Sequence, residues 1–126
     1  MDAGRSLPLR PPSAALSAEA MAAFEEGTSL VLSRWTALQM AVENKWGGHD
    51  SHQKADQLAS SLVSWFGQSN APHYIDELEE TLNDYMVLSF RTEIEDDSIG
   101  EVAEQLMIMH EDCVQGNYEA IKNMRH

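Results

Sequence analysis

The chain has 126 residues, which is long enough for one domain with a buried core. Its single cysteine excludes an intramolecular disulfide and a cysteine-based zinc site, as is typical of a protein in a reducing compartment. The formal net charge of -13 repels nucleic acid phosphates and anionic membrane surfaces, so direct binding to either is not expected. A field of this sign attracts basic proteins.

The acidic charge is concentrated in the second half of the chain. Residues 1–75 carry 7 acids and 5 bases, whereas residues 76–126 carry 14 acids and 3 bases. No apolar run approaches the roughly 18 residues that a membrane span needs, and the N-terminus lacks the apolar stretch of a secretory signal. The sequence therefore predicts a soluble intracellular protein.

The first predicted elements are a disordered arm and a long helix. Residues 1–16 hold three of the four prolines and show little apolar periodicity, which is typical of a flexible terminus. From Ser17, a plausible N-cap, apolar side chains recur in alternating steps of four and three residues, as on one face of a helix. Gly27 is unfavourable inside a helix and indicates a kink or a close helix crossing. The apolar face consists of Phe24, Thr28, Val31, Trp35, Leu38 and Val42.

The sequence WGGHDS, at residues 46–51, interrupts this helical pattern. Gly47 and Gly48 can adopt the left-handed conformation that ends a helix. Asp50 or Ser51 can then cap the next helix. This segment predicts a corner between two helices.

Two helices are predicted after the corner. The first runs to about Phe66 and is ended by Gly67, and the second follows Pro72. The second helix places acidic residues in its first turns, where the helix dipole favours them. The expected inward residues are Ala55, Leu58, Leu62 and Trp65 in the first helix and Ile75, Leu78, Leu82, Tyr85 and Met86 in the second.

An extended linker and a fourth main helix complete the predicted fold. Ser98 followed by Glu101 fits a capping box at the start of this helix, which ends near Gly116. A short C-terminal turn follows, and residues 121–126 are expected to be a flexible end. The sequence thus predicts an all-α, compact bundle of four main helices, with a single domain at residues 17–120.

The acidic clusters DELEE and EIEDD allow two interpretations. Outward carboxylates on an amphipathic helix normally lack the burial that shifts the pKa of a catalytic acid or base. The spacing around Gly100 also does not match a calcium-binding loop. We therefore favour a solvated acidic face over catalysis, and such a face can dock a partner.

Other candidate chemistry also has simpler explanations. His49, Asp50 and His52, near Asp56, form the only metal-like cluster, but polar loop residues with a helix cap account for the same pattern. Cys113 falls on the apolar face of the last helix, which favours a buried thiol over a nucleophile. Without a phosphate loop, a nucleophile elbow or a zinc-protease motif, we expect no enzyme, no cofactor and no bound metal.

The three tryptophans have different expected roles. Trp35 and Trp65 lie on apolar helix faces and are expected in the core. For Trp46 two interpretations remain open, because a tryptophan beside two glycines either pins the corner or serves as a partly exposed anchor for a partner.

The segment from Phe24 to Leu58, with its run WTALQMAVENKWGGHDS, closely resembles the signature of the WGG-domain family of pre-ribosomal-RNA-processing proteins. The resemblance resumes in EDDSIGEVAEQL and covers roughly residues 20–118. The matching residues are Phe24, Gly27, Trp35, Leu38, Ala41, Val42, Glu43, Asn44, Trp46, Gly47, Gly48, Asp50, Ser51 and Lys54.

This resemblance implies a non-enzymatic escort in the nucleus and cytoplasm. Such a protein takes a basic, zinc-binding protein of the small ribosomal subunit, number twenty-six, from its import receptor and delivers it to the pre-ribosome, supporting maturation of the small-subunit RNA. Family members typically continue into a long acidic tail, whereas this sequence ends at NMRH. The charge alone fits an alternative, a general acidic module for basic nuclear proteins such as histones. The expected partner-binding residues are Asp76, Glu77, Glu79, Glu80, Asp84, Glu93, Glu95, Asp96, Asp97 and Trp46.

Overall fold

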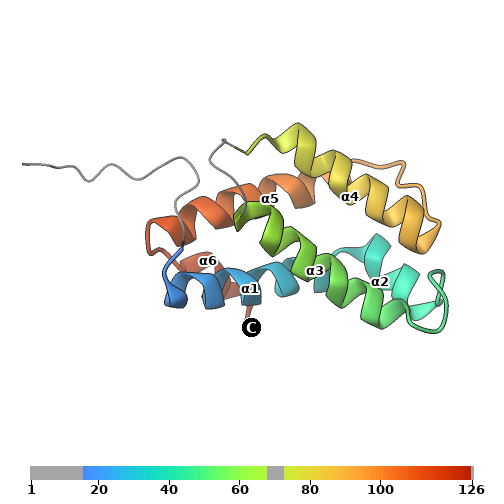
Figure 1. The fold of residues 1–126 in the computed structure, drawn as a ribbon, viewed down its shortest axis with the longest axis horizontal. Coiled ribbons are helices and arrows are strands. Elements are labelled where there is room, and N and C mark those ends of the chain that lie inside the picture. Colours follow the sequence, from blue (N-terminus) through green and yellow to red (C-terminus); the bar gives the residue numbers. More distant parts are fainter. Residues whose placement is uncertain (1–15, 68–72, 126) are drawn as a thin grey trace, which may run out of the picture.

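A computed structural model of the chain describes residues 16–67 and 73–125, which form helices and no strand (Figure 1). The predicted all-α fold is therefore confirmed. Except for Leu16, the expected N-terminal arm lies outside the described residues, as does the loop around Pro72. The helices are α1 (Ala18–Ser33), α2 (Thr36–Glu43), α3 (Ser51–Gly67), α4 (Ile75–Phe90), α5 (Ser98–Val114) and α6 (Glu119–Met124).

The long helix predicted from Ser17 is in fact two helices, so the described bundle has five main helices rather than four. Ser17 caps α1 as expected, since its hydroxyl accepts a hydrogen bond from the Ala20 N–H at 3.1 Å. Trp35 has an extended backbone between α1 and α2, and its side chain is buried. Because both helices bury a face in the same core, the apolar spacing continues across the break and does not reveal it.

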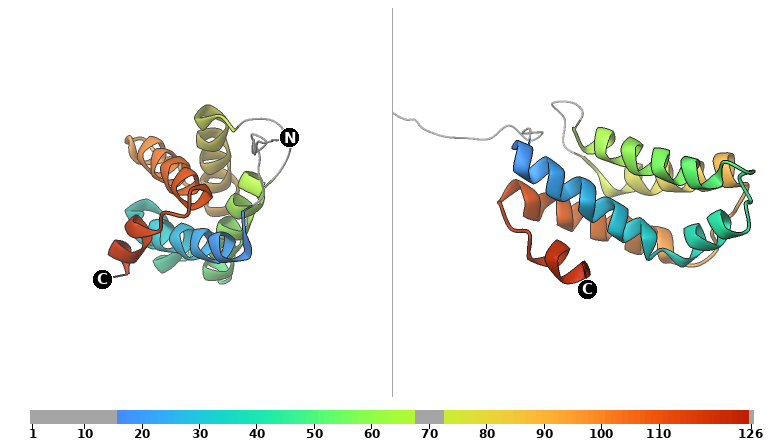
Figure 2. Two further views of the ribbon diagram at one scale, coloured as in Figure 1. Left: turned by 90° about the vertical axis from the view of Figure 1, so that its left-hand side faces the viewer. Right: turned by 90° about the horizontal axis from the view of Figure 1, so that it is seen from below.

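The helices share one core, with α1 at its centre. Helix α1 contacts α2, α3, α5 and α6, and α4 packs against α3 and α5. The two further views show one end of the bundle and its lower side (Figure 2). Phe24, Leu58, Leu82 and Leu106, from four different helices, are completely buried.

Gly27 marks a close crossing, because α1 continues through it without a break. A Cβ atom at this position would lie 3.0 Å from Cγ1 of Ile121 and would clash with the sulfur of Met109. Glycine thus allows α5 and α6 to approach the backbone of α1.

Helix α6 confirms the short C-terminal turn, but the expectation of a flexible end from residue 121 is wrong. Ile121 is buried in the core. The guanidinium of Arg125 donates two hydrogen bonds of 2.6 Å to the carboxylate of Glu26, and these bonds lower the pKa of Glu26. The chain turns back toward α1 because Gly116, with φ of +79°, lets it reverse after α5.

A cluster of rings holds the C-terminal end of α3. It consists of Phe24, Trp65, Phe66, His73 and His110, and the ring of Phe66 stacks on His110 with centroids 4.6 Å apart. A ring nitrogen of His73 lies 2.9 Å from the Phe66 carbonyl oxygen. Trp65 was expected in the core but is only half-buried, at the edge of this ring cluster, whereas Phe66 is buried.

Candidate functional site

The first feature of the site is the turn that ends α2. The Trp46 N–H donates to the Ala41 carbonyl at 2.9 Å, and the Lys45 N–H donates to the Val42 carbonyl at 3.1 Å. This pair of bonds is a Schellman motif, and the left-handed residue in it is Lys45, with φ of 56°. The prediction that a glycine ends the helix is therefore wrong, because both glycines lie after the reversal.

The two glycines instead shape the WGG corner, which we define as residues 44–51. Gly48 has φ of +99°, a conformation that favours glycine. At Gly47, a Cβ atom would lie 2.7 Å from the Ser89 carbonyl oxygen and 3.0 Å from Cδ1 of Phe90. Gly47 therefore lets the corner pack directly against the C-terminal end of α4.

Ser51 closes the corner from inside. It is buried, with 1% of its surface exposed. Its hydroxyl accepts a hydrogen bond from the Gly47 N–H at 2.9 Å and donates one to the Gly48 carbonyl at 2.7 Å. The sequence predicted that Asp50 or Ser51 caps the next helix. The Ser51 hydroxyl forms its hydrogen bonds with Gly47 and Gly48, in the turn before α3.

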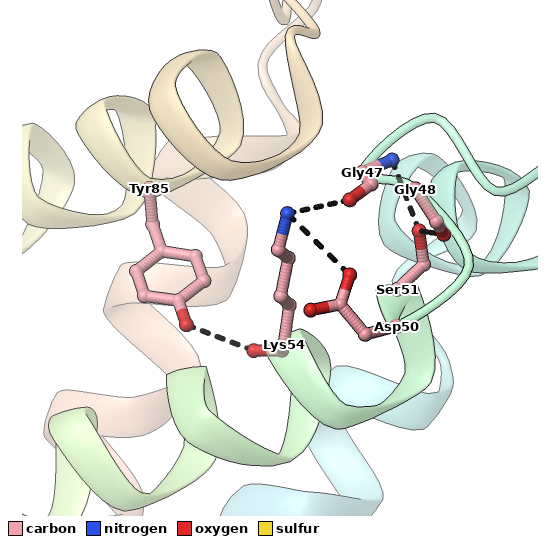
Figure 3. Close-up of polar contacts among 6 residues, drawn as sticks. All are labelled: Gly47, Gly48, Asp50, Ser51, Lys54 and Tyr85. Carbon is pink, nitrogen blue, oxygen red and sulfur yellow. Dashed lines mark hydrogen bonds and ion pairs between the residues drawn. The ribbon is translucent and has the colours of Figure 1, made fainter.

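Lys54 joins the corner to two helices (Figure 3). Its ammonium group donates to the Gly47 carbonyl at 2.5 Å and lies 3.7 Å from the Asp50 carboxylate. The Lys54 carbonyl accepts a hydrogen bond of 2.9 Å from the hydroxyl of Tyr85 on α4. Burial raises the pKa of Tyr85, so this hydroxyl remains a donor at neutral pH. The four-residue spacing of Asp50 and Lys54 was the signal in the sequence for the ion pair between them.

Trp46 projects from this hydrogen-bonded turn, and 42% of its surface is exposed. Together with Phe90, Arg91, Thr92 and Glu93 it lines a shallow hollow of about 400 Å³. Trp46 is therefore an exposed side chain on a fixed backbone.

Of the remaining motif residues, Trp35 and Glu43 lie outside the corner and Asn44 begins it. The indole N–H of Trp35 donates to the hydroxyl of Ser98 at 2.9 Å. No side-chain bond caps α5, so the predicted capping box of Ser98 and Glu101 is wrong. Asn44 is exposed, and its amide donates to the Met40 carbonyl at 2.9 Å, while Glu43 is exposed at the end of α2.

The predicted acidic residues form an exposed surface on α4 and on the extended segment before α5. Glu79 is half-buried, and the other eight are exposed. Ion pairs in the described part of the chain involve none of them. We call these nine residues the acidic surface: Asp76, Glu77, Glu79, Glu80 and Asp84 on α4, and Glu93, Glu95, Asp96 and Asp97 after it.

The two parts of the acidic surface are neighbours. A Cβ atom at Gly100, in the first turn of α5, would lie 3.7 Å from a carboxylate oxygen of Glu79. Hydrogen bonds from Ser98 lower the pKa of Asp96, which keeps that carboxylate ionised at neutral pH. The surface thus combines like charges from α4 and from the segment that leads into α5.

Comparison with known proteins identifies the family. Residues 24–104 match the WGG family, described as pre-rRNA-processing protein TSR2. The Saccharomyces cerevisiae protein of that name is 37% identical over 105 residues, which is 82% of this chain and 50% of the relative. This chain belongs to the TSR2 family. The Homo sapiens homolog is 36% identical over 106 residues, which is 84% of this chain and 55% of the relative.

A solved member of the TSR2 family has the same fold. The solution structure of yeast TSR2(1-152) matches with a TM-score of 0.77 and 35% sequence identity, covering 86% of this chain and 69% of that chain. This chain spans about half the length of the curated relatives. The matched residues 24–104 include the WGG corner and the acidic surface, whereas α6 lies beyond them.

The metal-like cluster near the corner does not come together. Only a pair forms: Nδ1 of His52 lies 3.7 Å from a carboxylate oxygen of Asp56, and both side chains are exposed on α3. Within residues 16–67 and 73–125, no group of three or more histidine, cysteine, aspartate or glutamate side chains is placed to hold a metal ion. None of the helices in these ranges has the length and apolar character needed to cross a membrane.

Cys113 is buried, as expected from its place on the apolar face of α5. Burial, together with the nearby Asp112, raises the pKa of its thiol to about 11. The thiol is therefore protonated at neutral pH, whereas a nucleophilic cysteine needs the thiolate.

Proposed function

We propose that this chain is a non-enzymatic acidic domain that binds a basic protein of the small ribosomal subunit, the zinc-containing protein twenty-six, and escorts it to the pre-ribosome. The names of the relatives state a role in pre-rRNA processing. In our proposal this chain contributes to that process by carrying the ribosomal protein between its import receptor and the assembly site, in the cytoplasm and the nucleus.

The observation that carries the proposal is the acidic surface. Nine carboxylates lie within one region, and none has a cationic partner among the described residues. Like charges at this density repel one another, and a basic client relieves that repulsion on binding. The attraction between exposed charges is screened by salt. Binding should therefore weaken strongly as the ionic strength rises.

The chemistry of the site favours binding over catalysis. The carboxylates are exposed to water, where an acid or base is not tuned for proton transfer. The one cysteine is buried and its thiol is protonated. The WGG corner uses its polar groups to hold the turn, which suits a rigid binding surface.

A titration tests the proposal directly. The 126-residue chain is titrated with purified small-subunit protein twenty-six at two salt concentrations, with a histone as the control protein. We expect tight binding that weakens with salt and a clear preference for the ribosomal protein. Equal affinity for the histone would favour the general acidic module, and no binding to either protein would contradict the proposal.

Charge reversal locates the binding surface. The variant with Glu79, Glu80, Glu95 and Asp96 all changed to lysine should lose binding while keeping its helical circular dichroism. The matched control changes four acids away from this surface, Glu25, Glu43, Asp56 and Glu119, to lysine, so both variants change the net charge of -13 by the same amount. If the two variants bind equally, the acidic surface is not the docking site.

A further inference from the structure

The outward face of α4 changes character along its length. Glu80 and Asp84 lie on this face, and the next two positions one turn further are Val87 and Leu88. Val87 is 36% exposed and Leu88 is 80% exposed, so two adjacent apolar side chains face solvent there. One helix face thus runs from an acidic part to an apolar part.

The apolar part leads toward the hollow at Trp46. Gly47 packs against Ser89 and Phe90, so the WGG corner lies beside the last turn of α4, as the ribbon also shows (Figure 1). The hollow is lined by Trp46 and by residues 90–93. At a rise of about 1.5 Å per residue, Glu80 and the end of α4 are roughly 15 Å apart. An extended peptide of about five residues spans that distance.

Charge decides which side chain suits the hollow. Arg91 and Glu93 line it with opposite charges, and its exposed aromatic surface comes from Trp46, since Phe90 is fully buried. A cationic side chain would approach Arg91, while a large neutral apolar side chain covers the aromatic surface without an unpaired charge.

We propose that the hollow at Trp46 takes one large apolar side chain from a basic client segment, whose lysines and arginines lie along the acidic part of α4. The inference rests on the proposed function and adds the identity of the anchor. The turn that carries Trp46 is fixed by its bond to Ala41 and by the contacts of Gly47. A tryptophan on a fixed backbone has only two side-chain torsions to order on binding, which suits an anchoring position.

The two parts of this surface have different effects on binding. The exposed carboxylates increase the rate of association and lose their effect in salt. Burial of an apolar side chain against Trp46 slows dissociation and is insensitive to screening. Segments that are basic but lack the apolar residue should therefore bind quickly and leave quickly.

Paired peptides test this inference. The first peptide, of about 15 residues, has one central phenylalanine flanked by lysines and glycines, and the second has alanine in its place. Both are titrated against the wild-type chain and against Trp46→Ala. We expect the phenylalanine peptide to bind the wild-type chain about tenfold more tightly than the alanine peptide, and the difference to vanish in Trp46→Ala.

Two further readouts guard against a folding defect. Trp46→Phe keeps an aromatic ring and should retain most of the preference for phenylalanine. In the ¹⁵N-labelled wild-type chain, the phenylalanine peptide should shift the indole N–H signal of Trp46, assigned by its loss in Trp46→Phe, but not that of Trp35, which bonds to Ser98. Tyr74→Ala, at the other end of α4 and also exposed, is the matched control and should leave the preference unchanged.

The outcomes separate the inference from the proposed function. Salt-sensitive binding of both peptides with equal affinity overturns the apolar anchor and leaves the acidic docking surface in place. A preference for phenylalanine that persists in Trp46→Ala overturns the hollow as its location. Failure of both peptides and of the ribosomal protein to bind overturns both proposals. A dimer of this chain that buries Trp46 would make a second copy, and not the client, the occupant of the hollow.

Discussion

The two ends of α3 are held by different kinds of interaction. At its start, Ser51 and Lys54 hold the WGG corner through directed hydrogen bonds to Gly47 and Gly48. At its end, Phe66 packs within the ring cluster. The first end depends on backbone geometry and also carries Trp46, whereas the second end depends on buried ring area. Changes at the two ends should therefore differ in their effects on stability and on partner binding.

The largest effect is expected at the ring cluster. Phe66→Ala removes a buried ring, and large-to-small changes of this kind cost about 3–5 kcal/mol of unfolding free energy. Urea denaturation measures the loss, with Ser64→Ala at an exposed position of α3 as the control. The folded fraction should bind its partner with normal affinity, because the change replaces no residue of the acidic surface or of the WGG corner. A loss below about 1 kcal/mol would contradict the role of the rings.

The next largest effect is expected at the corner. Gly47→Ala places a Cβ atom against Ser89 and Phe90, and such overpacking costs about 1–3 kcal/mol. Unlike Phe66→Ala, it should also weaken partner binding at equal folded fraction, because the corner carries Trp46. Gly67→Ala is the matched control, since a Cβ atom there has nothing within 4 Å. Equal stability of the two variants would show that the corner can move aside.

The corner at the start of α3 was predictable from sequence only in part. The glycines, Asp50 and Ser51 indicated a corner, since each residue type suits a turn or a helix start. The contact of Gly47 with α4 was not predictable, because it depends on how two helices distant in the sequence pack. The same holds for Lys45, which takes the left-handed position although glycine is usual there.

The apolar spacing predicted most of the core but not its interruptions. Leu58, Leu62, Leu78, Leu82 and Met86 are completely buried as predicted. The break at Trp35 was missed because the residues on both sides point to the same core, and Ser98 was assigned to a cap although its hydroxyl meets the Trp35 indole. The acidic surface was predictable as exposed, since charged residues alternate with the buried positions of α4. Its role in binding stays a prediction.

A smaller effect at the corner comes from Ser51→Ala. The change leaves the partly buried Gly47 N–H without its partner, which costs about 1–2 kcal/mol. Chemical denaturation compares this variant with Ser60→Ala, an exposed serine on the same helix. Partner binding should fall less than in Gly47→Ala, because no backbone displacement is forced. Unchanged stability would mean that water replaces the hydroxyl.

The smallest effect is expected from pH, and it belongs to the ring end alone. Burial and the nearby His73 lower the pKa of His110, and Glu111 opposes them. Phe24 and Phe66 cover the ring from α1 and α3. In the unfolded chain His110 takes up its proton at about pH 6.5, while in the folded chain it stays neutral to lower pH. The unfolded state therefore binds more protons in this window, and stability falls as the pH drops below about 6.5.

Denaturation midpoints between pH 7.5 and 5.5 measure this loss, in a window above the usual pKa range of carboxylates. His110→Phe keeps a ring in the cluster and should flatten the pH dependence, whereas His52→Gln, at an exposed position, should leave it unchanged. Partner binding should not follow the same pH profile, since the corner end contains no group in contact with His110. A pH dependence that survives in His110→Phe would assign the titration to another group and remove the difference in pH sensitivity between the two ends of α3.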